Sequence, residues 1–407
     1  MSELKQYKFS ELYDMSSGIS SKPEQAGHGF PFASFSAVFN NQFLPGSLPD
    51  LMDTSEKERK TYSIKEGDIF LTRTSETLDE LGMSSVVVNE IPNATYSGFL
   101  KRLRPKQTDV SYHKFMAFYL RSKLFRKTMS NNAIMTLRAS LNEQIFSYLD
   151  LLLPEYKEQQ KIGDYLYLLN QKIELNNLIN TELEAMAKLI YDYWFVQFDF
   201  PDANGKPYKS SGGKMVYNEA LKREIPEGWE ASPLPKLLEI KTGKQDANYS
   251  SNDGQYHFFT CADKALRCDG YEFEGKSILL AGNGNFNVKR YDGKFNAYQR
   301  TYVLKPHNPN FFSLVFYAVQ YKTKQLANGS RGSIVKFITK GDIEDICVPM
   351  PINHNNYFYD VLNTNLKKID TLYRENLKLE ELRDWLLPML MNGQITVNET
   401  SQKKGRG

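Results

Sequence analysis

Residues 155–195 read EYKEQQKIGDYLYLLNQKIELNNLINTELEAMAKLIYDYWF, and this stretch follows Pro154 without an internal proline. Steps of four and three residues alternate along it and select an almost continuous apolar series, which predicts a long helix with one packing seam. A helix of roughly 36 residues at ~1.5 Å per residue is on the order of 50 Å long. The predicted seam consists of Ile162, Leu166, Leu169, Ile173, Asn176, Asn180, Leu183, Ala187 and Ile190.

The same pattern recurs 196 residues later in the chain. This second seam consists of Phe358, Leu362, Asn365, Ile369, Leu372, Asn376, Leu379, Arg383 and Leu386. Two such seams can pack against each other, and a buried asparagine in a seam sets the register of the helices. Asn180 and Asn376 occupy equivalent positions, so either they fix this register or they face solvent at the end of a bundle. We interpret the two helices as spacers that hold domains apart; the alternative is the core of a plain helical bundle.

The rest of the chain also repeats itself, with a spacing that shrinks in steps. FSELYDMSSG at 9–18 aligns with LPKLLEIKTG at 234–243, an offset of 225 residues. Later matches, at offsets of 209, 201 and 197, join Ile69 to Ile278, Pro105 to Pro306 and Pro154 to Pro351. An offset that falls only at expected loops predicts two copies of one domain, the second with shorter connections.

The predicted fold class is α+β, with two repeated mixed α/β domains separated by two long antiparallel coiled-coil helices in a pseudo-twofold arrangement. Strands are expected at 68–72, 85–88, 278–281 and 297–304, and short helices at 112–129 and 311–327. The predicted boundaries are 1–153 for the first domain, 154–200 for the central spacer helix, 201–230 for a linker, 231–350 for the second domain, 351–395 for the distal spacer helix and 396–407 for a flexible basic tail.

Composition indicates a folded protein without special covalent chemistry. The chain has 407 residues, of which 41% are hydrophobic and 24% charged, as is usual for globular proteins. No apolar run reaches the ~18 residues of a membrane helix and no secretory signal is visible, so we expect a cytoplasmic protein. Three scattered cysteines argue against a disulfide scaffold and a zinc finger.

Basic charge is concentrated at equivalent places in the two copies. Residues 101–138 carry ten basic side chains against one acid, and residues 275–340 carry eleven against one. Basic segments interleaved with aromatic and amide side chains are typical of a face that binds double-stranded DNA, although a solvated surface is the alternative. The candidate DNA contacts are Arg73, Lys101, Arg102, Arg104, Arg121, Lys123, Arg126, Lys127, Arg138, Asn283, Asn285, Lys289, Arg290, Lys294, Arg300, Lys322, Lys324, Arg331 and Lys336.

No pattern in the sequence predicts catalysis or a metal site. The best candidate for a nuclease centre, Asp50 followed by Glu58, has short spacing within a stretch that resembles a solvated loop. The five histidines stand singly, without the spacing of metal ligands. The glycines in AGNGNF, residues 281–286, more readily let a loop bend close to a partner than cradle a phosphate.

Four stretches together resemble the DNA-specificity (S) subunits of type I restriction-modification systems. They are LPEYKEQQKIGDYLYLLNQKIELNN at 153–177, MAKLIYDYWFVQFDFPDANGKPYKSSGGKMVYN at 186–218 with REIPEGWE at 223–230, and KKIDTLYRENLKLEELRDWLLPMLMNGQI at 367–395. One departure is that the second long helix lacks the EQ found at Glu158 and Gln159 in the first, so docking of partners there is expected to differ in detail.

The resemblance implies two target-recognition domains, each reading one half of a split DNA site. It also implies that the long helices dock methyltransferase subunits, expected to be two, and that restriction or translocase subunits join the complex. S-adenosylmethionine, ATP and magnesium would then belong to those partners, with no cofactor and no chemistry in this chain. The alternatives are a stand-alone DNA endonuclease or modification enzyme with an unrecognised site, and a purely structural coiled-coil scaffold.

Overall fold

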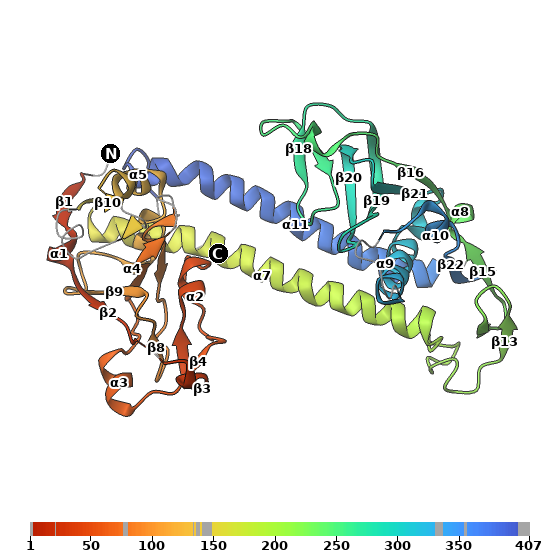
Figure 1. Cartoon of the computed structure of the whole chain (residues 1–407), viewed down its shortest axis with the longest axis horizontal. Helices are drawn as coiled ribbons and strands as arrows, with labels where there is room; N and C mark the ends of the chain where they lie inside the picture. Colours follow the sequence, from red (N-terminus) through yellow and green to blue (C-terminus); the bar gives the residue numbers. More distant parts are fainter. Residues whose placement is uncertain are drawn as a thin grey trace, which may run out of the picture. The chain divides into compact units, whose positions relative to one another are not determined.

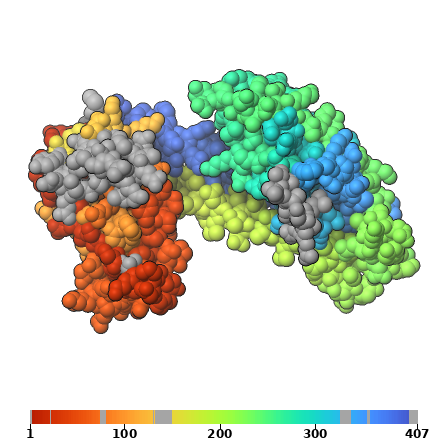
Figure 2. Space-filling view, viewed as in Figure 1, coloured from red at the N-terminus to blue at the C-terminus, as the bar shows by residue number. Residues whose placement is uncertain are grey.

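The computed structural model describes residues 3–20, 22–75, 80–132, 134–135, 139–140, 149–329, 337–353 and 356–397. The chain divides into two compact units (Figure 1). Unit 1 joins Met1–Asn176 to Glu375–Gly407, and unit 2 is Asn177–Arg374. Residues from both ends of the sequence therefore build unit 1, whose surface carries red, orange and blue atoms in Figure 2.

The main sheet of unit 1 is antiparallel and has four strands. Its order is β2 (Tyr13–Ser17), β9 (Leu100–Pro105), β5 (Ile69–Thr72) and β7 (Ser84–Val86). Beside it, β1 (Lys5–Lys8) pairs with β12 (Asp150–Leu153), and α1 (Phe9–Leu12) follows β1 directly. The helices α4 (His113–Tyr119) and α5 (Lys123–Asn132) complete the core, in which Phe115 and Phe118 are buried among strand residues such as Ile69.

A smaller layer of unit 1 has its own apolar core around Val38, Phe70 and Tyr96. Its sheet has the order β4 (Leu51–Met52), β3 (Ala26–Ala33) and β8 (Thr95–Tyr96), with α2 (Phe35–Phe39), α3 (Glu56–Thr61) and the turn η1 (Pro23–Gln25) beside it. The remaining strands of the unit are β6 (Thr74–Ser75), β10 (Ile134–Met135) and β11 (Ala139–Ser140).

Unit 2 contains a six-stranded sheet. Its order is β16 (Leu238–Thr242), β21 (Thr301–Pro306), β19 (Phe273–Ala281), β20 (Val288–Ala297), β17 (Tyr256–Phe259) and β18 (Leu266–Cys268). Around it lie β13 (Met215–Asn218) with β14 (Arg223–Pro226), β15 (Trp229–Pro233) with β22 (Cys347–Pro351), α8 (Leu234–Leu237), α9 (Phe312–Gly329), α10 (Lys340–Glu344) and the turns η4 (Ala247–Tyr249) and η5 (Pro309–Phe311).

The strand registers of the two units agree with the repeat offsets. Tyr13 pairs with Pro105 in unit 1, and Leu238 pairs with Pro306 in unit 2, so the offsets of 225 and 201 give equivalent pairs. Lys5 pairs with Leu153, and its equivalent Glu230 pairs with Met350. Since one slipped residue would turn every side chain to the opposite face, these matches confirm the alignment of these strands.

The two long helices are α7 (Tyr156–Tyr191), which continues into a short π-helix at Asp192–Val196, and α11 (Asn356–Met391). Within unit 1 they run antiparallel, because Asn176 donates to Asn376 Oδ1 at 2.8 Å while Arg383 donates to Asn170 at 3.0 Å. Of the predicted seam positions, the buried ones are Ile162, Leu166, Leu169, Ile173, Asn176, Ala187, Phe358, Leu362, Ile369 and Asn376.

The seam differs from the prediction at two positions. The buried partner of Asn376 is Asn176 rather than the equivalent Asn180, which is only half-buried. In α11, Leu366 is buried at the place where the prediction put its neighbour Asn365, which is half-buried. A straight helix drifts relative to a strict seven-residue repeat, so the face that packs moves by one position along the helix.

Two further predictions about local structure are wrong. The helix expected at 112–129 is interrupted at 120–122, where the Ser122 hydroxyl accepts from Phe125 N and starts α5 afresh. The strand expected at 297–304 is broken by a turn in which Thr301 N donates to Tyr298 O. Of the basic tail expected at 396–407, Val397 packs against the core of unit 1, and residues 398–407 lie outside the described residues.

Candidate DNA interface

In each unit, three neighbouring strands of the main sheet reach the same edge. In unit 1, β2 and β5 end there and the antiparallel β9 begins there; β16, β19 and β21 do the same in unit 2. The connections at this edge are named loop face 1, comprising residues 18–20, 34–36, 73 and 97–99, and loop face 2, comprising residues 243–245, 260–264, 282–287 and 298–300.

A glycine lets two loops cross closely on each face. A Cβ atom added to Gly18 would lie 2.2 Å from the Tyr96 carbonyl oxygen, and one added to Gly243 would lie 2.1 Å from the Ala297 carbonyl oxygen. Backbone oxygen atoms cannot move aside as a flexible side chain can. The sequence repeat aligned these two glycines, and their close approach to the neighbouring loop gives the physical reason.

Equivalent backbone hydrogen bonds hold both loop faces. Arg73 N donates to Phe99 O at 3.0 Å, and at the same offsets Gly282 N donates to Arg300 O at 2.8 Å. Ser97 N donates to Ala33 O in loop face 1, as Tyr298 N donates to Phe259 O in loop face 2. The two units therefore present different side chains, such as Phe99 and Arg300, from one backbone scaffold.

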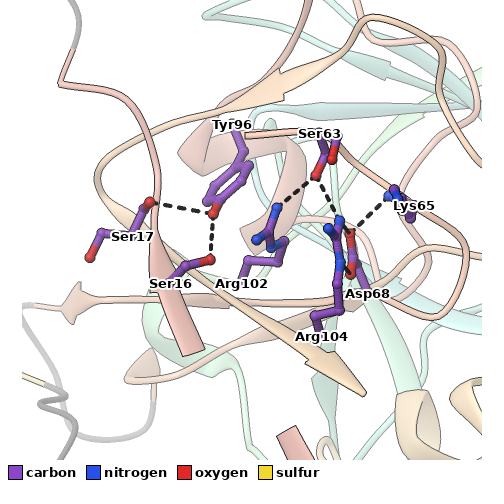
Figure 3. A network of polar contacts seen from close by, with 8 residues as sticks. All are labelled: Ser16, Ser17, Ser63, Lys65, Asp68, Tyr96, Arg102 and Arg104. Atoms are coloured by element: carbon purple, nitrogen blue, oxygen red, sulfur yellow. Dashed lines mark hydrogen bonds and ion pairs between the residues drawn. The ribbon is translucent and has the colours of Figure 1, made fainter. Parts of the chain in front are cut away.

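Beneath loop face 1 lies a polar network that spans several strands (Figure 3). Arg104 donates to both carboxylate oxygens of Asp68, at 2.7 and 2.6 Å, and to Ser63 O at 2.9 Å. Arg102 donates to the same carbonyl at 2.8 Å, while the Tyr96 hydroxyl bonds Ser16 Oγ at 2.8 Å. The network ties the strands that carry loop face 1 into one rigid piece.

The electrostatics of this network follow from its burial and its ion pair. Burial lowers the pKa of Arg102, whereas the hydrogen bond to Asp68 raises the pKa of Arg104. Lys101, next along β9, is buried and donates to Ser17 Oγ at 2.8 Å. These three cations of the sequence-based set are bound within the fold, so their charge is not freely offered to a ligand.

Arg121 is likewise half-buried within unit 1. Its guanidinium donates to the carbonyl oxygens of Ser84 and Asn41, at 2.6 and 3.0 Å, and burial lowers its pKa to about 10. Arg126 donates to Gly82 O at 3.3 Å. Lys123 and Lys127 are exposed on α5, and Arg73 is exposed on loop face 1. Arg138 lies outside the described residues.

In unit 2 the predicted cations also divide into bound and exposed groups. Arg290 pairs with Asp370 of α11 at 3.0 Å and lies 4.0 Å from Glu184 of α7, so it ties β20 to both helices. Lys289 donates to the Ala262 carbonyl, Lys294 lies over the Tyr271 ring, and Lys322 is half-buried with a pKa lowered by burial. The exposed members are Lys294, Arg300 and Lys324, and Arg331 and Lys336 lie outside the described residues.

Loop face 2 carries a cluster of amide groups around one carboxylate. Asn285 and Asn287 both donate to Asp263 Oδ1, at 2.8 and 3.1 Å, and Asn287 also donates to Asn285 Oδ1 at 2.8 Å. Asn285 therefore has its donor and acceptor engaged, whereas Asn283 is half-buried beside it. The sequence reasoning missed Asp263 because it selected basic segments, and it missed Asn287 although the polar string NGNFN contains it.

Loop face 1 also holds an aromatic side chain that the charge pattern did not reveal. Phe99 is 67% exposed, next to the backbone of Arg73. An exposed ring on a loop suits stacking on a base or packing against a thymine methyl group. An exposed phenylalanine cannot be recognised as such from sequence alone, because most phenylalanines are buried.

The described part of the chain contains no group of three or more His, Cys, Asp or Glu side chains placed to hold a metal ion. None of the described helices combines the length and the apolar character needed to cross a bilayer.

Comparison with known proteins adds independent findings. The model of the type I restriction modification DNA specificity domain matches residues 1–185 and 226–381. The chain is 37% identical over 184 residues to the Escherichia coli type I restriction enzyme EcoDI specificity subunit, a match covering 44% of this chain and 41% of that protein. It is 25% identical over 377 residues to the MjaIX specificity subunit of Methanocaldococcus jannaschii, a match covering 85% of this chain and 82% of that protein.

A solved structure has a similar fold. The S subunit of a type I restriction-modification system from M. genitalium aligns with a TM-score of 0.63, covering 98% of this chain and 97% of that one. Sequence identity over the alignment is 14%, so the similarity concerns the fold alone.

Proposed function

Because the chain belongs to the family of type I restriction-modification DNA specificity proteins, we propose that it is the subunit that reads the DNA sequence in such a complex. It reads a bipartite site in double-stranded DNA and does no chemistry itself. The one observation that carries this proposal is the repeated loop scaffold: equivalent backbone bonds support different side chains on loop face 1 and loop face 2. Two such faces suit two half-sites of different sequence.

In this proposal, residues 1–153 and 231–350 are the recognition domains. Residues 154–200 and 351–395 form spacer helices that pack as a coiled coil, and residues 201–230 link the halves. Two methyltransferase subunits and the restriction subunits bind this chain, and S-adenosylmethionine, ATP and magnesium belong to them.

The proposed contacts to DNA are five exposed cations of the predicted set and the half-buried Asn283. Arg73 and Arg300 lie on the loop faces, where a guanidinium suits a guanine edge or a phosphate. Lys123, Lys127 and Lys324 suit phosphates, which position a protein on the duplex without reading its sequence. Asn283 is proposed to contact adenine, since its amide can both donate and accept.

A genome-wide map of methylated adenines, in cells with and without this chain, tests the proposal. We expect a split motif to be methylated only when the chain is present. Replacing residues 1–150 by those of a relative should change one half of that motif and leave the other unchanged. An unchanged methylation map contradicts the proposal, and methylation or cleavage by the purified chain alone would favour a stand-alone enzyme.

A further inference from the structure

A cavity in unit 2 lies between α7, α9 and residues 285–288, at the end of loop face 2. Its volume is about 220 Å³. Lys188 of α7 lines it, together with Gln320, Thr323 and Lys324 of α9 and with Asn287. Asn285, Phe286 and Val288 complete the lining, so elements distant in sequence bring two ammonium groups, three amides and a hydroxyl to one small space.

The charge of the cavity favours an anion. Lys188 and Lys324 are both exposed, so their hydration is retained and their ammonium groups can reach a ligand at the mouth. Two carboxylates lie near the cavity: that of Asp192, whose pKa is raised by burial while Lys324 acts in the opposite direction, and that of Asp263, which accepts from Asn287. Asp263 also acts on Lys289, so three ammonium groups, those of Lys188, Lys324 and Lys289, stand against two carboxylates and leave a net positive charge.

Two polar atoms at the cavity are buried and, within the described residues, make no hydrogen bond. They are the Thr323 hydroxyl, on a residue that is 4% exposed, and the side-chain oxygen Oδ1 of Asn287. An unsatisfied buried group costs about 1–3 kcal/mol, so such groups in a native fold call for a ligand or an ordered water. Both atoms belong to residues that line the cavity.

We propose that this cavity binds a backbone phosphate of the DNA that the chain reads. The Thr323 hydroxyl and the Gln320 amide donate to the phosphate oxygens, and the two lysines balance its charge. A lysine ammonium has three donors, so it can bond the phosphate and the side-chain oxygen Oδ1 of Asn287 at the same time. This inference rests on the proposed DNA-reading function.

The cavity lies directly beside the proposed base-reading loops. Asn287 also donates to the Cys261 carbonyl at 2.9 Å and to Asp263, so the side chain that borders the cavity is bonded to residues 260–264 of loop face 2. A phosphate fixed here sets the register of the duplex against loop face 2, since phosphate contacts position and base contacts specify.

The test measures DNA affinity of the full chain assembled with its methyltransferase subunits, as a function of salt. Each phosphate contact contributes about −0.9 to the slope of log affinity against log salt. The variant K188Q/K324Q should reduce the steepness of this slope by about one. The fold loss of affinity between 50 and 200 mM salt should then be about 3.5 times smaller for the variant than for the wild type. K236Q is the matched control, because Lys236 is exposed on α8, at the end of β16 that faces away from loop face 2.

Thr323→Val provides a second variant that keeps the shape of the side chain. If the hydroxyl serves only the ligand, its loss should leave stability unchanged or raised, while DNA affinity falls several-fold. A single methylphosphonate, placed at each backbone position in turn, should weaken wild-type binding at one position and have no such effect at that position in K188Q/K324Q.

The probes are a duplex carrying the mapped motif and a random-sequence duplex of the same length. An unchanged salt slope in K188Q/K324Q, with sequence-specific binding by the wild type, overturns the phosphate site alone. Equal affinity of the wild type for both duplexes overturns the proposed function, and the slope on the random duplex still decides the cavity. Stabilisation of the chain by inorganic phosphate through these lysines, without a change in the DNA slope, would assign the cavity to a free anion and refute the proposal.

Discussion

Removing the Asp68 carboxylate should destabilise unit 1 strongly, because the group is fully buried and bonded three times. It accepts from Arg104 Nε and Nη2, at 2.7 and 2.6 Å, and from Lys65 N at 2.8 Å. Breaking a buried ion pair by removing one partner costs about 3–5 kcal/mol. The Arg104 side chain is 27% exposed and can recover part of its hydration. We therefore expect Asp68→Ala to lower the free energy of unfolding by about 2–4 kcal/mol.

The assay is denaturant unfolding of the full chain, with hydrogen exchange to assign the loss to unit 1, since a chain with two units need not unfold in one step. Asp150→Ala is the control: its pair with Lys8 spans 3.8 Å at the surface, and such pairs contribute less than about 1 kcal/mol. Adding Arg104→Met to Asp68→Ala should restore part of the stability, because no lone buried charge remains. Equal losses in Asp68→Ala and Asp150→Ala would refute the reasoning.

Three further predictions concern single side chains. Asn176→Leu should cost about 1–3 kcal/mol, because it leaves the buried Asn376 oxygen unpaired, and the double leucine variant should recover part of this in a double-mutant cycle. Gly18→Ala should lower both the melting temperature and DNA affinity, since its Cβ would meet a backbone oxygen, whereas Gly46→Ala, which has open space, should not. Burial lowers the pKa of His113, so its stability contribution is present above the unfolded-state pKa of about 6.5 and is lost as pH falls toward the folded-state value. Unfolding midpoints at pH 7.5 and 5.5 should therefore differ less in His113→Gln; an unchanged difference contradicts the assignment.

The sequence predicted the repeat and the long helices, because each leaves a periodic or offset pattern in the chain, and the strand registers agree with the repeat offsets. It did not predict that Arg104 forms an ion pair with Asp68, because those residues are 36 positions apart and meet only through the pairing of β5 with β9. A count of basic residues cannot separate an arginine that bonds carbonyl groups, such as Arg121, from one that faces solvent, such as Arg300.

The loop faces could be predicted in part. The sequence selected four residues that lie on them, Arg73, Asn283, Asn285 and Arg300. In the fold, Arg73 bonds the backbone of Phe99 and Arg300 bonds the backbone of Gly282, at equivalent places in the two units. Asp263 escaped prediction because its role comes from the amides that surround it in space. The choice of Asn176 over Asn180 as the partner of Asn376 depends on how the helices pack, which a heptad pattern fixes only to within a position or so.

The split composition of unit 1 affects how the chain folds as it leaves the ribosome. Leu390 and Met391 are buried in the same core as Phe115 and Phe118, more than 250 residues upstream. Unit 2 can complete its fold once residue 374 has emerged from the ribosome. The apolar surface of residues 1–176, in contrast, stays uncovered until α11 has been synthesised. The nascent protein therefore exposes this apolar surface while residues 177–374 are being synthesised, and this is the interval in which aggregation is favoured.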